Sequence, residues 1–393
     1  MDRSIGAKPV ERSRRRWAIL FASFLAFVAY AFALQEAPPL IPSIIEEFNI
    51  SHAEAGFVMS IVLVPGILLG LPAGLLVARF GVKLVGFVSL ACVALGSLVT
   101  TTADSFIVTL VGRLILGIGG AFIIAAAPAS IAQWFAREEL GKAMGIYGAN
   151  MPFATVIAFP VASVYMLAYG WRFPFYIGLA VGIAATAVFA AVIKEGPLSG
   201  QKRKLSARRA IGNLEIWKVG VVWLFFSAAT LSFTTWAPTL LERYQNLPKV
   251  YASFLASLLM WAAIFCVPVY GYVSDKIGRR KPFALAGFVL MTLAFTALAF
   301  TSNLALVASI LALGITAAMI PPIASALPAE ILGPDLASLG FGITGMCLSL
   351  GAALAQPLIG FLLDVTKSYT LCLLGMSTLS VIGAIVAYTL RSR

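Results

Sequence analysis

The sequence predicts an all-α membrane protein whose twelve transmembrane helices form two pseudo-symmetric six-helix bundles. Its mean hydropathy is +0.97, and only 11% of its residues are charged, compared with about a quarter in ordinary soluble proteins. Apolar runs recur along the chain, each near the roughly 20 residues that a helix needs to cross a bilayer core of about 30 Å. The chain also repeats a motif after 197 of its 393 residues. Such internal repetition indicates that the chain contains two copies of one structural unit.

The repeated motif lies between apolar runs and carries most of its charge in the second copy. That copy reads Gly271-Tyr-Val-Ser-Asp275-Lys276-Ile-Gly278-Arg279-Arg280. The first copy is weaker and reads Gly74-Leu-Leu-Val-Ala78-Arg79-Phe-Gly81. Both glycine pairs are separated by the same 197 residues, so the two halves of the chain are expected to correspond span by span.

Taken in order, the apolar runs predict six spans on each side of a basic linker. The first six are 17–37, 54–78, 83–102, 105–133, 140–167 and 172–193. The linker covers 194–215, and the second six are 216–241, 250–274, 282–301, 303–327, 337–363 and 369–390. The domains are therefore a bundle in 1–193 and a second bundle in 216–393. Because proline lacks an N–H, Pro128, Pro152 and the pair Pro321-Pro322 are expected to interrupt their spans.

The distribution of cations predicts the orientation. With the N-terminus inside, 23 of the 28 Lys and Arg residues fall in inner segments and four fall in outer loops. Cytoplasmic loops carry this excess of positive charge in membrane proteins. We therefore expect a multi-pass protein of the cytoplasmic membrane, in bacteria the cell inner membrane, with both termini in the cytosol. The net charge of +12 then reflects contact with the lipid bilayer, and no nucleic-acid partner is expected.

A fainter repeat lies inside the second half. Gly360-Phe-Leu-Leu-Asp364 resembles Gly271-Tyr-Val-Ser-Asp275 at an offset of 89 residues, three spans later and so on the opposite face. Nested repeats of three inverted spans are a known plan of transporters.

These motifs resemble those of the major facilitator superfamily over essentially the whole chain. The resemblance implies a solute path between the two bundles and alternating access, with the Gly-x-x-x-Asp motif acting as a cytosolic gate. The alternative is that its charges only anchor a short loop at the membrane surface. This chain departs from the pattern at Ala78, where the family has an acid, whereas Asp275 is kept.

Arg113 is the most unusual residue within a span. It lies about eight residues into span 4, where a guanidinium costs about 2.5–3.5 kcal/mol to insert. Arg113, Gly117, Gly120 and Ile124 share one helix face, and Arg-x-x-x-Gly-x-x-Gly resembles a family motif linked to coupling or anion binding. We expect Arg113 to bind solute or to couple transport to protons, and the alternative is a structural Arg bound to backbone carbonyls.

Several other polar residues in spans are candidates for contact with solute or protons. Glu36 is either a protonatable coupling residue or an acid at the outer mouth, and with Tyr30 and Gln35 it does not form one helical stripe. The remaining candidates are Tyr147, Asn150, Trp236 and Gln356. Each could instead serve helix packing, and Trp236 could lie at the interface.

The sequence contains no motif of an enzyme. The single histidine, His52, excludes a histidine-based metal site or catalytic triad, and no phosphate-binding loop is present. We therefore expect no catalysis, no metal and no cofactor, and transport driven by a gradient rather than by ATP.

The sequence thus predicts a monomeric secondary transporter, symporter or antiporter, that moves a small organic or inorganic anion together with protons. Arg113 is the basis for the anion, although the glycine-rich signatures of the nitrate/nitrite branch are not evident. A multidrug or sugar/metabolite transporter coupled to protons is the alternative, and a non-transporting membrane sensor is a remote one.

Overall fold

The computed structural model describes residues 15–135, 137–196, 211–333 and 336–390, and within them all regular structure is helical. Twelve helical segments of this part of the chain are long and apolar enough to cross a membrane. Residues 52–101 supply two of these segments, and some of the others are interrupted by a short break. The predicted fold class is therefore confirmed. The predicted linker lies mostly outside the described residues, as do Arg12 and Arg14 of the basic N-terminus.

The helices follow one another with short connections. In the first half of the chain they are α1 (Arg15–Gln35), the 3-10 turn η1 (Pro38–Leu40), α2 (Ile41–Phe48), α3 (His52–Thr101), α4 (Phe106–Ala132), α5 (Arg137–Tyr147), α6 (Asn150–Tyr169) and α7 (Phe173–Val192). In the second half they are α9 (Leu214–Tyr244), α10 (Lys249–Ile277), α11 (Arg280–Phe300), α12 (Asn303–Ala317), α13 (Ile320–Leu332), α14 (Ala337–Thr366) and α15 (Tyr369–Tyr388).

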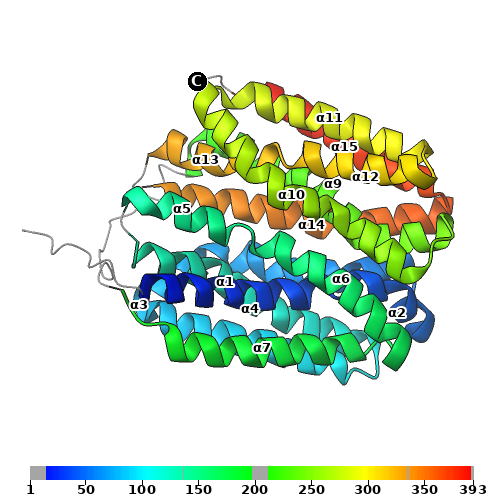
Figure 1. The fold of residues 1–393 in the computed structure, drawn as a ribbon, viewed down its shortest axis with the longest axis horizontal. Coiled ribbons are helices and arrows are strands. Elements are labelled where there is room, and N and C mark those ends of the chain that lie inside the picture. Colours follow the sequence, from blue (N-terminus) through cyan, green and yellow to red (C-terminus); the bar gives the residue numbers. More distant parts are fainter. Residues whose placement is uncertain (1–14, 136, 197–210, 334–335, 391–393) are drawn as a thin grey trace, which may run out of the picture.

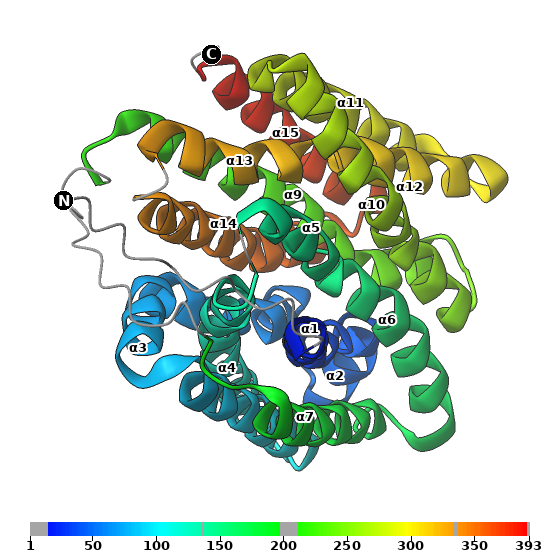
Figure 2. The ribbon, with the colours of Figure 1, turned by 60° about the vertical axis from the view of Figure 1, so that its left-hand side comes forward.

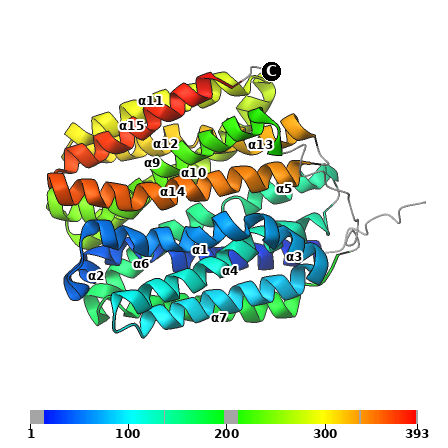
Figure 3. The ribbon, with the colours of Figure 1, turned by 180° about the vertical axis from the view of Figure 1, so that it is seen from behind.

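The helices run side by side along the long axis of the molecule (Figure 1). We call α1–α7 the N-half and α9–α15 the C-half; the two lie against each other (Figures 2 and 3). The first and last described residues, Arg15 and Leu390, lie at one end of the helices, which we call the terminal face. The opposite end, where α2 lies, is the distal face (Figure 1).

The structure corrects the expected breaks in several spans. Spans 54–78 and 83–102 form one run, α3, that turns at Gly81 (φ 84°, ψ 160°), a conformation that glycine adopts without strain. Span 140–167 is divided into α5 and α6, and span 303–327 into α12 and α13, whose first turn contains Pro321 and Pro322. Proline at the start of a helix loses no helical hydrogen bond. The break expected at Pro128 was wrong, because α4 continues through it.

Contacts between the halves come mainly from α3 against α14 and α6 against α10. Along α3 the gap to α14 widens from the distal to the terminal face. A Cβ on Gly56 would lie 2.7 Å from the Cα of Pro357, and one on Gly66 would lie 3.0 Å from Ser349 Oγ. The distance rises to 3.9 Å at Gly70, and at Gly74 nothing lies within 4 Å. The halves therefore touch at the distal face and diverge toward the terminal face.

This gradient predicts opposite outcomes for two matched glycine substitutions. Gly56→Val should lower the free energy of unfolding by about 1–3 kcal/mol, since the added methyl groups would meet backbone. Gly74→Val should change it by less than about 0.5 kcal/mol, because the space beside Gly74 is open. Thermal unfolding of the two purified variants compares them directly, and equal destabilisation would contradict the divergence of α3 and α14.

Candidate functional site: a cavity between the two halves

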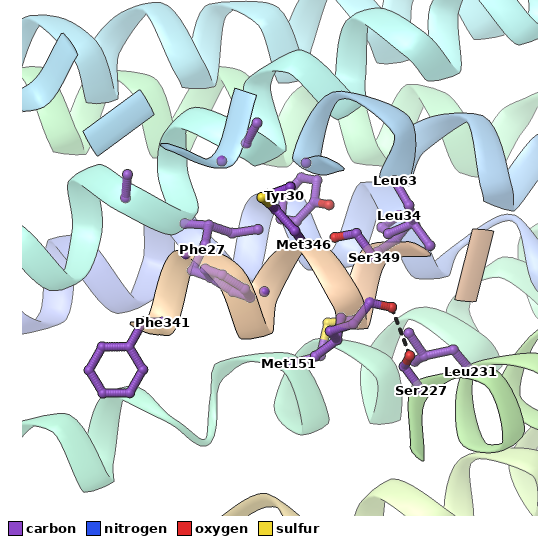
Figure 4. A pocket seen from close by; sticks show the side chains of 18 of the residues that line it. Phe27, Tyr30, Leu34, Leu63, Met151, Ser227, Leu231, Phe341, Met346 and Ser349 are labelled. Carbon is purple, nitrogen blue, oxygen red and sulfur yellow. Dashed lines mark hydrogen bonds between the residues drawn. The ribbon is translucent and has the colours of Figure 1, made fainter. Parts of the chain in front are cut away.

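A cavity of about 660 Å³ lies between the halves. Helices α1, α3, α4 and α6 line it from the N-half, and α9 and α14 line it from the C-half (Figure 4). On α3 the lining extends from Met59 to Val77, which is about 27 Å at 1.5 Å per residue. The cavity therefore begins near the closed distal contact and follows the widening gap toward the terminal face.

The cavity wall is apolar, and none of the described residues that line it is charged. Aromatic and methionine side chains make up much of it: Phe27, Met59, Met151, Phe226, Phe341 and Met346. Seven lining residues carry a polar side chain: Tyr30, Gln35, Ser227, Thr234, Thr235, Ser349 and Gln356. Most of these hydroxyls and amides are already bonded within the protein; Ser227, for example, donates to the Leu348 carbonyl at 2.7 Å (Figure 4).

Some of the candidate residues predicted from the sequence line the cavity, and others lie outside its lining. Tyr30, Gln35 and Gln356 line the cavity, whereas Arg113, Glu36 and Trp236 are buried outside its lining. Tyr147 and Asn150 also lie outside the lining, and the Tyr147 ring packs edge-on against Phe27 with centroids 5.8 Å apart. Ser349, which also lines the cavity, was not among the predicted site residues, although it lies seven residues before the candidate Gln356 and so on the same helix face.

Arg113 binds the end of α1. Its Nη1 donates to the carbonyl of Ala33 at 2.6 Å, and its Nη2 donates to that of Leu34 at 2.9 Å. The last carbonyls of a helix have no partner within it, and Pro38, four residues after Leu34, has no N–H to offer. Arg113 Nε also donates to the carbonyl of Val58 on α3 at 3.1 Å. The guanidinium thus joins three helices, and its charge suits the negative end of the α1 dipole.

The two glycines that follow Arg113 allow this arrangement. A side chain on Gly117 would collide with the backbone of Val62, so α3 and α4 lie in direct contact there. A side chain on Gly120 would collide with the ring of Tyr30. The motif of Arg113, Gly117 and Gly120 therefore holds α1, α3 and α4 together behind the cavity wall.

Glu36 follows the end of α1 and is fully buried. Both of its carboxyl oxygens lack a hydrogen-bond partner, and the carboxyl packs on Gly178 of α7, where a Cβ would lie 2.5 Å from Oε2. Arg113 acts on it electrostatically, but the guanidinium bonds to carbonyls and sulfur instead. Arg113 and Glu36 are therefore an electrostatic pair without a direct hydrogen bond.

At the distal face, Asp364 of the C-half caps α3 of the N-half. Its Oδ1 accepts from the backbone N–H of His52 at 3.1 Å, and its Oδ2 accepts from that of Ala53 at 2.8 Å. The His52 ring adds a contact of 2.7 Å from Nδ1 to Oδ1. The first N–H groups of a helix are unpaired and favour a negative charge. Asp364 was not among the predicted site residues, although the resemblance of its motif to the one that ends at Asp275 could have identified it.

Further bonds close the distal face around this cap. Gln356 accepts from Ser60 Oγ on α3 at 3.2 Å, and Trp236 Nε1 donates to the Gln356 carbonyl at 2.9 Å. Arg243 of α9 pairs with Glu46 of α2 at 2.7 Å. Among the residues described, the Arg243–Glu46 ion pair and the His52–Asp364 contact join the two halves, and both lie at this face. Trp236 is therefore part of the distal contact rather than of the cavity wall.

Comparison with known proteins agrees with this architecture. The family model of the Major Facilitator Superfamily matches residues 19–253 and 238–393. The chain belongs to the Major Facilitator Superfamily.

Two relatives and one solved structure illustrate the likeness. A "Probable nitrate/nitrite antiporter" of Thermus thermophilus is 26% identical over 286 residues, which cover 69% of this chain and 63% of that protein. A "Probable sulfoacetate transporter" of Cupriavidus necator is 24% identical over 418 residues, covering 96% of this chain and 94% of the relative. The crystal structure of a bacterial homologue of the lysosomal transporter Spinster, inward-facing and occupied, superposes with a TM-score of 0.81. That chain is 17% identical, with 98% of this chain and 97% of that one covered.

The superfamily motif at the terminal face forms its contacts within the C-half. Gly278 ends α10 in the left-handed conformation (φ 69°). Arg280 then bonds to Asp275 at 2.7 Å and to Glu330 of α13 at 2.8 Å. Lys276 and Arg279 are exposed, and Gly271 approaches Pro322 of α13. These contacts of the motif, among the described residues, therefore all lie within the C-half, and its expected role as a cytosolic gate stays a prediction.

The first copy of the motif obtains an acid from elsewhere in the chain. Glu195, which follows α7, accepts from the backbone N–H of Lys83 at 3.2 Å and covers Gly81. It binds where α3 resumes after its turn, so it acts as an N-terminal cap. Arg79 lies over the Phe80 ring, 5.2 Å from its centroid.

Removing the guanidinium of Arg113 should destabilise the protein strongly. We expect Arg113→Leu to lower the free energy of unfolding by about 3–5 kcal/mol, because it leaves buried carbonyls and Glu36 without their partner. Arg79→Leu, which removes an exposed cation, is the matched control and should cost less than about 0.5 kcal/mol. Thermal unfolding measures both, and similar melting temperatures would argue against the cap on α1.

Removing the charge of Asp364 should loosen the distal face. Hydrogen bonds to a charged group contribute about 1.5–3 kcal/mol, so Asp364→Asn should raise distal opening roughly tenfold or more. Labelling of a Ser60→Cys reporter by a membrane-impermeant maleimide measures this opening in a background without the native cysteines. Asp275→Asn is the control, since Asp275 bonds within the C-half, and faster labelling in that variant alone would refute the assignment.

Proposed function

We propose that this member of the superfamily is a proton-coupled secondary transporter of a small anion, working as a monomer in the cytoplasmic membrane. The terminal face is assigned to the cytosol, because the predicted inner segments carry 23 of the 28 cations. The protein would then be inward-facing here. The bundles 1–193 and 216–393, joined by the linker 194–215, rock about the cavity between them.

The pairing of Arg113 with Glu36 carries this proposal. When Glu36 is ionised, its charge offsets that of Arg113 and the pair is neutral. When Glu36 takes up a proton, the charge of Arg113 is uncompensated. Arg113 lies directly behind the cavity wall, because its Nη2 contacts Leu34 and Met59, which both line the cavity. Binding of a proton therefore makes the electrostatic potential of an otherwise uncharged cavity more positive.

A more positive potential attracts an anion, so the proton and the anion favour each other's binding. This reciprocity follows from thermodynamic linkage. The low polarity of the surroundings strengthens it, because charges interact more strongly in a medium of low dielectric constant. The names of the two relatives, which refer to nitrate, nitrite and sulfoacetate, support an anion as the solute.

Glu36→Gln should uncouple transport from protons. Glutamine cannot take up a proton, so we expect accumulation driven by an inward proton gradient to fall at least tenfold, while exchange of labelled for unlabelled anion continues. Binding of the anion should strengthen toward acid pH in the parent protein and lose that dependence in the variant. Uptake of nitrate and of sulfoacetate into proteoliposomes, with and without the gradient, measures this.

The control is Glu47→Gln, which alters an acid that pairs with Arg172 at the distal face and should leave coupling intact. Gradient-driven uptake by the Glu36 variant at the parental rate would overturn Glu36 as the proton site. Uptake of organic cations or sugars in place of anions would favour the multidrug or sugar alternative.

A further inference from the structure

Two hydroxyls in the cavity have no hydrogen-bond partner among the described residues. The Tyr30 hydroxyl belongs to α1 of the N-half and the Ser349 hydroxyl to α14 of the C-half, and both residues line the cavity. Neither hydroxyl bonds to another group in the described part of the chain. Figure 4 shows both oxygens directed into the space between the helices. The other serine and threonine hydroxyls of the lining bond to backbone carbonyls or to the amide of Gln356.

The position of each hydroxyl is set by a glycine on a neighbouring helix. The Tyr30 ring occupies the place of a side chain at Gly120 of α4, and Ser349 Oγ lies 3.0 Å from a Cβ built on Gly66 of α3. The positive charge of Arg113 also acts electrostatically on Tyr30. A hydroxyl that lies near a positive charge can donate a strong hydrogen bond to a solute oxygen that carries negative charge.

The rest of the cavity suits a different kind of group. Its volume of about 660 Å³ lies within the range of roughly 300–1,000 Å³ that is typical of sites for organic ligands. An inorganic oxyanion occupies only on the order of two or three water volumes of ~30 Å³ each. Phe27, Met151, Phe226 and Met346 form much of the remaining wall. Apolar carbon atoms of a ligand gain free energy of burial when they pack against these side chains instead of contacting water.

We propose that the solute is an organic anion with an apolar body, whose acidic head is bound by the hydroxyls of Tyr30 and Ser349. This inference rests on the proposed anion transport and narrows its substrate class, placing nitrate and nitrite outside it. Because each half supplies one hydroxyl, the bound head joins the two halves. The apolar body lies along the aromatic and methionine walls.

A chain-length series of carboxylates tests the apolar body. The probes are acetate, butyrate and hexanoate, titrated by calorimetry into the full-length protein in lipid nanodiscs, with empty nanodiscs as the blank. We expect affinity to rise about fourfold for each added methylene, the factor that burial of one CH₂ group supplies. Phe226→Gln, which alters an apolar lining residue on α9, should reduce the gain for hexanoate and leave acetate unchanged.

Two conservative substitutions test the acidic head. Tyr30→Phe and Ser349→Ala should each weaken binding of every carboxylate by roughly tenfold, the loss expected for one hydrogen bond to a charged group. Neither should change the melting temperature, since these hydroxyls bond to nothing else in the described chain. Unchanged affinity in both variants would overturn the assignment of the head.

The remaining outcomes distinguish this inference from the proposed function. Binding of nitrate and acetate with no gain along the series would overturn the apolar body and leave anion transport standing. Equal binding of butylamine and hexylamine, which carry a cationic head on the same chains, would overturn both the head assignment and the proposed anion transport.

Discussion

The structure depends on how the end of α1 is satisfied inside the membrane. Pro38 and Pro39 end the helix and withdraw the N–H groups that would bond to its last carbonyls. Arg113 supplies donors to Ala33 and Leu34 from another helix. A backbone carbonyl without a partner is costly where no water is present, so the break in α1 and the buried cation of α4 explain each other. The same contact places Arg113 behind the wall of the cavity.

That placement changes how a cation can serve transport. A positively charged side chain in the cavity wall would bind an anion by direct contact. Arg113 lies instead behind Leu34 and Met59, and in the proposed mechanism its effect on the cavity depends on the protonation of Glu36. In this proposal, the binding of one proton changes the electrostatic potential at the position of the solute. Both groups are buried and no hydrogen bond joins them, so in this proposal the charge balance changes with a single proton.

The two faces of the protein differ in the acids that join the halves. At the distal face, Asp364 crosses from the C-half to the first N–H groups of α3. At the terminal face the corresponding acid of the N-half is absent, since residue 78 is alanine, and Asp275 bonds to Arg280 within its own half. A cap that crosses between halves stabilises the state in which that face is closed. The chain therefore favours closure at the distal face, which is the conformation observed.

The sequence by itself determined the number of spans and the twofold repeat, and it marked Gly81 and Gly278 as corresponding positions of that repeat. These follow from local features of the chain: apolar runs of sufficient length, and a motif that recurs after 197 residues. It also identified Arg113, Glu36 and Gln356 as unusual, because polar groups within a bilayer need partners. It could not say which partners they have. Only the tertiary structure decided that Arg113 binds the end of α1, that Asp364 caps a helix more than 300 residues away, and that Tyr30 and Ser349 face one cavity. The physical reason is that these contacts join helices whose relative rotation and depth are set by packing, and packing is not encoded in any single stretch of the chain.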